Sequence, residues 1–278
     1  MTYGLLFLII LATAFGAFAN QKESYKDLIS KSQNLSLQHD RLQACQILIR
    51  ALQKENKNSS AYRELRTSLD NLSGVFYTDQ AQATFAQGES LLETKPKEAI
   101  DKFQEALKLE DGNMAILKAL ARAQLRIDDC RGADTNIKNA ENFDSVSAEY
   151  HLLRLQALDC HKDFDALNEE LKEKDIDLDG IEKFMKVFSV DENFQKKDFK
   201  KARQQLSLWE TQSPDYPEVY FWKWQISNAQ GVPDKVSGQK YLQLCKAMTA
   251  RKRKSFNLDV DLCKSTEDVE AKLKTFKL

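Results

Sequence analysis

Apolar residues recur every three or four positions along much of this chain, which is the spacing of one face of an α-helix. Between residues 60 and 77 the apolar face of a predicted amphipathic helix is formed by Tyr62, Leu65, Leu69 and Leu72. We expect this helix to be interrupted near Ser73-Gly74. A further short helix is predicted after residue 265, where Ser-Thr-Glu-Asp forms a helix-start signature before an apolar face.

One arrangement of small and bulky residues returns after 34 residues. Within each of two consecutive 34-residue units, position 20 is a small residue, position 24 is a bulky one and position 27 is again small. These are Ala99, Phe103 and Ala106 in residues 80–113, and Ala133, Ile137 and Ala140 in residues 114–147. Two antiparallel helices approach closely only where a small side chain faces the crossing point, so the pattern predicts tandem helix pairs.

This pattern resembles the tetratricopeptide repeat, a 34-residue unit of two helices. Four looser units complete a set of six and cover residues 25–58, 147–180, 183–216 and 217–250. The resemblance implies an all-α fold, a right-handed α-solenoid of antiparallel helix pairs with a short C-terminal capping helix. It divides the chain into an N-terminal unit with an extra helix (20–78), tandem repeats (79–252) and a capping segment (253–278), with stacking broken near residue 73.

The first nineteen residues carry no charged side chain and contain the apolar run Leu5 to Ala14, followed by Ala17-Phe18-Ala19. This pattern is typical of a secretory signal peptide (1–19) that is cleaved before Asn20. The alternative is a retained membrane anchor formed by residues 3–19, although such a segment barely reaches the roughly 20 residues needed to span a bilayer. We therefore expect an exported protein, periplasmic or secreted.

Composition supports a folded helical protein. Hydrophobic residues make up 42% of the chain and charged residues 30%, with only nine glycines and four prolines among 278 residues. The formal net charge of −1 gives no global field that would recruit nucleic acid.

Five cysteines leave at least one thiol unpaired. In a stack of helix pairs, residues equally distant from a connecting loop become neighbours, and Cys130 and Cys160 lie about fifteen residues on either side of Asp144. We expect these two to form a disulfide, and we expect Cys245 and Cys263 to tie down the C-terminal segment. Cys45 shares an apolar helix face and is interpreted as a buried free thiol.

No catalytic motif accompanies these features. The chain lacks HExxH, GxxxxGK[ST], GxGxxG and GxSxG, and its adjacent Cys160 and His161 point in different directions on a helix. We predict no enzyme activity, cofactor or metal. The stretch from Asp175 to Gly180 has alternate carboxylates and is either a plain turn or a weak calcium site, because Lys186 stands where a calcium loop needs a bidentate Glu.

Lys118, Arg122 and Arg126 recur every four residues on one predicted helix and share one face. The resemblance implies that this face lines a concave groove, where Lys and Arg bind anionic groups of a peptide. The alternative is a solvated charged face. Around this basic stripe we expect a mixed groove formed by Phe85, Leu92, His151, Leu155, Phe184 and Phe221.

We expect a protein-binding scaffold that captures a peptide or partner protein, with an acidic group, in this groove. The alternative is a cell-envelope component that self-associates or docks to membrane machinery through its aromatic C-terminal repeats, with Trp222 or Trp224 exposed. The basic run at residues 251–254 is either a solvated helix end or a contact for phosphate or anionic lipid. The sequence does not specify the partner or the oligomeric state.

Overall fold

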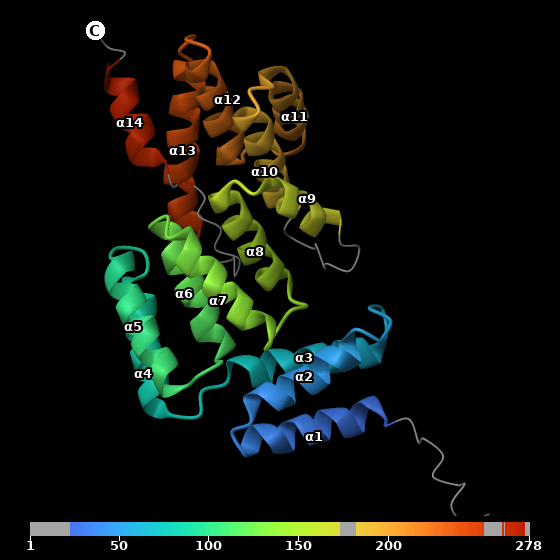
Figure 1. The fold of residues 1–278 in the computed structure, drawn as a ribbon. Helices are drawn as coiled ribbons and strands as arrows, with labels where there is room; N and C mark the ends of the chain where they lie inside the picture. The colour runs from blue at the N-terminus through green and yellow to red at the C-terminus, as the bar shows by residue number, and fades with distance from the viewer. Residues whose placement is uncertain (1–22, 173–181, 253–262, 264, 276–278) are drawn as a thin grey trace, which may run out of the picture.

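The structure, a computed structural model, describes residues 23–172, 182–252, 263 and 265–275. Within these ranges it contains fourteen α-helices and no strand (Figure 1). The first seven helices are α1 (Tyr25–Leu37), α2 (Arg41–Leu52), α3 (Ser60–Gly74), α4 (Asp79–Leu91), α5 (Pro96–Leu109), α6 (Met114–Arg126) and α7 (Cys130–Glu141). The others are α8 (Ala148–His161), α9 (Phe164–Lys172), α10 (Glu182–Gln195), α11 (Phe199–Gln212), α12 (Pro217–Ala229), α13 (Lys235–Lys252) and α14 (Thr266–Thr275).

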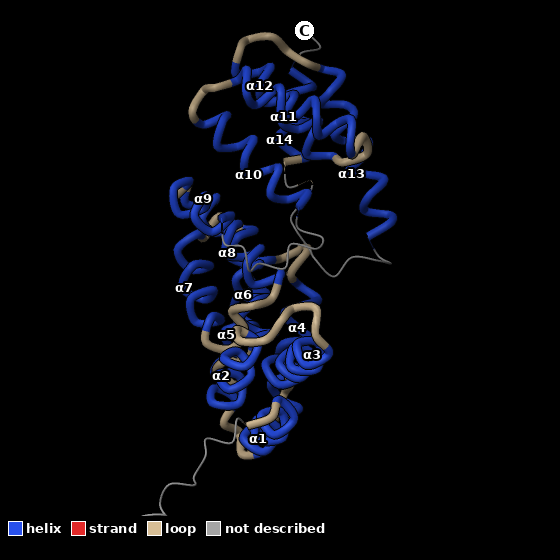
Figure 2. Tube along the Cα trace, turned by 90° about the vertical axis from the view of Figure 1, so that its right-hand side faces the viewer, coloured by secondary structure: helices blue, strands red, loops and turns tan. Residues whose placement is uncertain are grey.

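Twelve of these helices form the six antiparallel pairs that the 34-residue repeat predicts, namely α1/α2, α4/α5, α6/α7, α8/α9, α10/α11 and α12/α13. Helix α3 is the predicted extra helix, and it ends at Gly74, where the apolar pattern stops. Helix α14 is the predicted capping helix. Figure 2 shows the resulting elongated stack, with α1 at one end and α12 and α14 towards the other.

Four of the pairs use the same tight turn between their helices. A residue in the left-handed conformation (φ 58° to 63°) ends the first helix, and the next residue is an Asp whose carboxylate accepts a backbone N–H of the second helix. The four Asp residues are Asp40, Asp129, Asp163 and Asp198. This shared turn sets the angle between the helices and keeps the repeat geometry in units whose sequences have otherwise diverged.

Close helix crossings occur where the sequence places small residues. In the α4/α5 pair, a Cβ added to Gly88 would lie 2.5 Å from the ring of Phe103, which is fully buried beside Ala99 and Ala106. Any side chain at Gly88 would therefore push the two helices apart, because the packed ring has no space into which it can move.

Helices α1 to α3 lie across the end of the stack rather than parallel to its other helices (Figure 1). Helix α3 packs on α1 and α2 and also reaches α6. The anchor is Arg41 at the start of α2, which is buried and donates hydrogen bonds to Glu110 (3.0 Å) and to the carbonyl oxygens of Val75 (2.5 Å) and Asp111 (3.2 Å). The predicted break in regular stacking thus produces a crosswise unit held by a buried ion pair.

The C-terminal half has an aromatic core. Trp209, Tyr216 and Trp222 pack with aliphatic residues of α8 to α12, and Trp224 packs with Tyr241 of α13 under helix α14. Trp222 and Trp224 are both buried. The interpretation that one of these tryptophans is an exposed contact is therefore wrong, because the two side chains lie on opposite sides of α12 and each side is covered by other helices.

Candidate binding pocket

A cavity of about 250 Å³ lies between α3, α4, α6 and α8. Its wall combines two bases, three acids and a set of small or apolar groups. The lining residues are Asp70, Ser73, Gly74, Phe85, Glu89, Met114, Ala115, Lys118, Ala119, Arg122 and Glu149. The pocket therefore lies where the crosswise helix α3 meets the regular repeats, and no single repeat forms it alone.

Small residues bring the helices together around this pocket. The Cβ position of Gly74, at the end of α3, is 3.7 Å from the Cβ of Ala115 in α6. On the α4 side, the ring of Phe85 packs between Phe76 (centroids 5.2 Å apart) and Phe103 (5.6 Å), which fixes an apolar wall. The polar groups of the pocket stand on helices rather than loops, which favours a fixed geometry.

Two cations of the predicted basic stripe converge on one carboxylate in the pocket. Lys118 and Arg122 of α6 both form ion pairs with Glu149, which lies in the first turn of α8. The Lys118 and Arg122 side chains are only 19% and 21% exposed, so solvent screens these pairs less than it would at a free surface. The solvated charged face considered above is therefore not what α6 presents.

A second ion-pair network supports the pocket from α3. Arg66 donates to both carboxylate oxygens of Asp144 (2.7 and 2.8 Å) and also pairs with Asp70 on its own helix. Burial acts to raise the pKa of Asp144, but hydrogen bonds and charge from Arg66 hold this pKa below its usual range. Burial lowers the pKa of Lys118, and the neighbouring Arg122 contributes in the same direction. The pocket is thus lined by linked ion pairs, with more acids than bases, rather than by an open basic groove.

Arg126, the third cation of the stripe, is not among the residues that line this pocket. Its guanidinium binds Glu93 at the end of α4 through two hydrogen bonds of 2.9 and 2.7 Å. Lys118 and Arg122 therefore pair with Glu149 of α8, whereas Arg126, one turn further along α6, pairs with Glu93 beyond the end of α4.

Two other residues predicted for the groove lie in the interior. His151 is buried and its Nδ1 is 2.8 Å from Glu170 of α9, while Leu155 is fully buried in the core shared by α8 to α12. The groove prediction needs this correction because these positions on α8 face the partner helix and the next repeat. Leu92 is also buried, Phe221 packs in the C-terminal core, and the side chain of Phe184 lies outside the described residues.

The key acid, Glu149, is absent from the sequence-based site. It lies in the first turn of α8, 31 residues after Lys118 and 27 after Arg122. A search for carboxylates in the first turn of the helix that follows each basic stripe would have found it, since neighbouring first helices of a solenoid pack side by side. No comparable sequence pattern identifies Asp70 as a pocket residue, because its position relative to α6 depends on the angle at which α3 crosses the stack.

The four paired cysteines lie as the sequence predicts. Cys130 joins Cys160, and Cys245 joins Cys263, each with Cα atoms 5.6 Å apart. Cys45 is a buried free thiol, and burial raises its pKa to about 12. At neutral pH this thiol stays protonated, which makes it a poor nucleophile.

Among the described residues, no group of three or more His, Cys, Asp or Glu side chains could hold a metal ion. The stretch from Asp175 to Gly180, with its calcium prediction, lies outside these residues, as do the predicted signal peptide and residues 253–254 of the basic run. None of the helices in the described part of the chain is long and apolar enough to cross a membrane.

The helix pairs and the shared turns form an α-solenoid with a tetratricopeptide-like fold, and the crosswise N-terminal unit departs from its regular stacking. The structure is similar to the crystal structure of a tetratricopeptide repeat protein from Parabacteroides merdae ATCC 43184, with a TM-score of 0.52 and 13% sequence identity. The match covers 91% of this chain and 99% of that chain. At this identity the likeness shows the fold. No protein-family model and no curated protein matches the sequence.

Proposed function

We propose that this protein is an exported scaffold that captures a segment of a partner protein in the pocket between α3, α4, α6 and α8. The tetratricopeptide-repeat fold supports a protein-interaction role in general. The observation that carries the specific proposal is the convergence of Lys118 and Arg122 on Glu149 beside the apolar wall of Phe85. A partially buried site with fixed cations and an aromatic wall suits a peptide that carries an acidic group.

In this proposal Glu149 is the counter-ion of Lys118 and Arg122 before a ligand binds. An incoming carboxylate would take the place of Glu149 on Lys118 and Arg122, and Glu149 would turn out to solvent. Because one ion pair replaces another, the exchange itself contributes little affinity. Most of the binding energy would come from apolar contact with Phe85 and Met114, and the charges would select the ligand.

The size of the cavity limits the ligand. A volume of about 250 Å³ is below the range of roughly 300–1,000 Å³ that is typical of small-molecule sites. The pocket therefore suits one or two residues of a partner, such as a chain end or an acidic side chain, and the rest of the segment would lie along α4 and α8.

The test uses short synthetic peptides that differ at one position, with Asp or Glu in one set and Lys in the other. Nuclear magnetic resonance titration should show acidic peptides shifting the signals of Lys118, Arg122 and Phe85. Glu149→Gln should tighten their binding about fivefold, since the resident competitor is removed, and Arg122→Glu should weaken it at least tenfold. Binding of the Lys peptides alone, or weaker binding by the Glu149→Gln variant, would refute the acidic-group proposal.

A matched control is Lys102→Glu, which reverses an exposed charge on α5 that pairs with Glu105. It changes the net charge as much as Arg122→Glu does but lies outside the pocket, so the affinity for acidic peptides should stay the same. Loss of affinity in this control would show that overall charge, rather than the pocket, governs binding.

Export rests on the cysteines and on the N-terminal pattern. Disulfides persist in oxidising compartments and are rare in the cytosol, so the two cysteine pairs support an exported protein. Mass spectrometry of the protein purified from its native cells should find an N-terminus at Asn20. An intact chain that begins at Met1 would argue instead for a retained anchor.

A further inference from the structure

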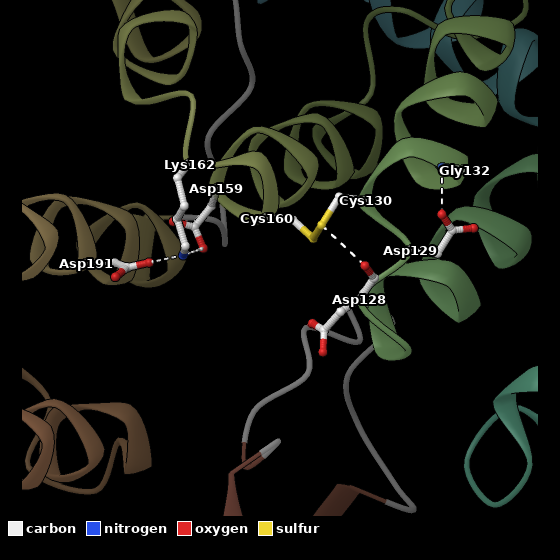
Figure 3. The surroundings of a disulfide bond; sticks show 8 residues. All are labelled: Asp128, Asp129, Cys130, Gly132, Asp159, Cys160, Lys162 and Asp191. Atoms are coloured by element: carbon white, nitrogen blue, oxygen red, sulfur yellow. Dashed lines mark hydrogen bonds and ion pairs between the residues drawn. A yellow bond between two sulfur atoms is a disulfide. The ribbon is translucent and has the colours of Figure 1, made fainter.

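A compact charged cluster lies at the end of α8, away from the pocket. Lys162 follows the last turn of α8 in the left-handed conformation (φ 59°, ψ 30°). Its ammonium lies 2.5 Å from Asp191 of α10 and 3.6 Å from Asp159 of α8. Figure 3 shows the three side chains converging, with the Cys130–Cys160 disulfide on the other side of Asp159.

The cluster has one cation for two carboxylates. Asp191 is buried, and its second oxygen accepts a hydrogen bond from Gln195 (3.0 Å). The Oδ1 atom of Asp159 is also buried but has no hydrogen-bond partner among the described residues. A buried carboxylate oxygen without a partner is costly, and a proton on Asp159 would remove this cost by allowing a hydrogen bond to Asp191.

Burial raises the pKa of Asp159 to about 7. The negative charge of Asp191 adds to this effect, and the positive charge of Lys162 opposes it. Two carboxylates with one ammonium thus bind a proton near neutral pH, where an exposed aspartate would be fully ionised.

The other charged and polar groups around the cluster have partners of their own. On α10, Glu192 pairs with Lys196 (2.6 Å) and accepts a hydrogen bond from Asn168 of α9 (3.1 Å). On the α6–α7 turn, the carboxylate of Asp129 accepts the N–H of Gly132, as Figure 3 shows together with Asp128. His161, next in sequence to the disulfide, is exposed. The proton balance of the site therefore depends mainly on Asp159, Lys162 and Asp191.

Because the cluster joins α8 to α10, its charge affects how strongly these two helices hold together. Cys160 ties the end of α8 to α7, so Asp159 is fixed on the α6–α8 side of the solenoid. Asp191 belongs to α10. Phe188 and Val190 of the same helix pack in the apolar core that also contains Leu155 of α8. A hydrogen bond from protonated Asp159 to Asp191, or repulsion between the two ionised side chains, therefore acts directly between α8 and α10.

We propose that Asp159, Lys162 and Asp191 form a proton-controlled joint between α8 and α10, which is closed when Asp159 is protonated and loosened when both aspartates are charged. The folded protein holds this proton up to about pH 7, whereas an ordinary aspartate releases it near 3.8. The folded state therefore binds more protons in this window, and the stability of the junction falls as pH rises through it. Above about pH 8 no further loss is expected from this group.

Native-state hydrogen exchange measures this joint directly in the full-length protein. After correction for the intrinsic exchange rate, amides of α10 should open about tenfold more often at pH 8 than at pH 6. Asp159→Asn, which mimics the protonated acid at all pH values, should remove this difference. Asp101→Asn, an exposed change on α5, should keep it. Equal pH dependence in the wild type and in Asp159→Asn would overturn the proposal.

Two further variants should shift the transition in opposite directions. Asp191→Asn removes the repelling charge, so Asp159 should titrate at lower pH, while Lys162→Gln removes the attracting charge and should move the titration higher. The carboxyl carbon signal of Asp159 in nuclear magnetic resonance spectra reports this titration independently of local opening. Titration of Asp159 near pH 4 in the wild type, or a shift of both variants in the same direction, would exclude the joint.

A local measurement is needed because another acid titrates in the same range. Burial also raises the pKa of Glu218, at the start of α12, to about 7. Thermal melting of the whole protein would mix the two effects. The amides of α8 and α10 separate them, since Glu218 accepts its hydrogen bond from Cys263 at the C-terminal end of the solenoid.

Discussion

The two ends of the molecule use their helices in different ways. From α8 to α12 the helices share one apolar core, which is filled by Trp209, Trp222 and aliphatic side chains. At the N-terminal end, α1 to α3 cross the stack, and the contact is made by the ion pairs of Arg41 and Arg66 around a polar pocket. Regular stacking leaves surfaces that apolar side chains can fill, whereas a crosswise contact leaves irregular space that ion pairs and a cavity occupy. The break in the repeat thus creates the candidate site.

The largest expected effect is in the aromatic core. Trp209→Ala should reduce the free energy of unfolding by about 3–5 kcal/mol, because it removes a 1% exposed side chain and leaves a cavity. Chemical denaturation measures this loss. The neighbouring Leu208 is 63% exposed, so Leu208→Ala should cost less than about 0.5 kcal/mol. Similar losses in the two variants would contradict a close-packed C-terminal half.

A slightly smaller loss is expected where α1 to α3 are anchored. Arg41→Met leaves Glu110 buried without its cation and should cost about 3 kcal/mol. Arg50→Met, on the exposed face of the same helix, is the control and should be nearly neutral.

The pH dependence of the Arg41 contact sharpens this test. Burial acts to raise the pKa of Glu110, but hydrogen bonds from Arg41 and its other partners lower this pKa below its usual 4.5. The contribution of the pair is therefore present above about pH 4.5 and is lost as pH falls through the depressed pKa. The difference in unfolding free energy between Arg41→Met and the wild type should shrink in acid. A constant difference would show that Arg41 acts through packing alone.

The smallest of the three effects is expected at a regular helix crossing. Gly88→Ala places a methyl group against the buried ring of Phe103 and should cost about 1–3 kcal/mol. Gln87→Ala, one residue earlier on the exposed side of α4, should have little effect on stability. Thermal unfolding compares the two. A stabilised Gly88→Ala variant would mean that the α4/α5 pair separates easily, so that close crossing is not what holds the regular repeats together.

Much of the fold can be predicted from local sequence patterns. The 34-residue spacing of Ala99 and Ala133 predicts the helix pairs, and the weak pattern after Leu72 predicts the end of α3. The cysteine pairs follow from counting residues on either side of a loop, because antiparallel helices turn equal distances along the chain into neighbours. These features depend on spacing alone, and spacing is fully contained in the sequence.

The candidate site was predicted only in part. The common face of Lys118 and Arg122 follows from helical periodicity, as does the aromatic character of the wall at Phe85. Periodicity does not identify their counter-ion, because Glu149 belongs to the next repeat. It also assigns His151 to the wrong side of α8, since a shift of one residue in the repeat register rotates a helix by about 100°.

The sequence by itself determined the helices, their pairing and the cysteine partners, because each of these depends on residues within one or two adjacent units. Only the tertiary structure decided where α3 crosses the stack, which acid meets the basic stripe and which aspartates share one lysine at the α8–α10 junction. These contacts depend on angles between rigid helices, and a small change of angle at one crossing moves a distant side chain by several ångströms. No local sequence pattern contains the combined effect of these angles. Charged residues far apart in the chain therefore become neighbours only when the whole solenoid has formed.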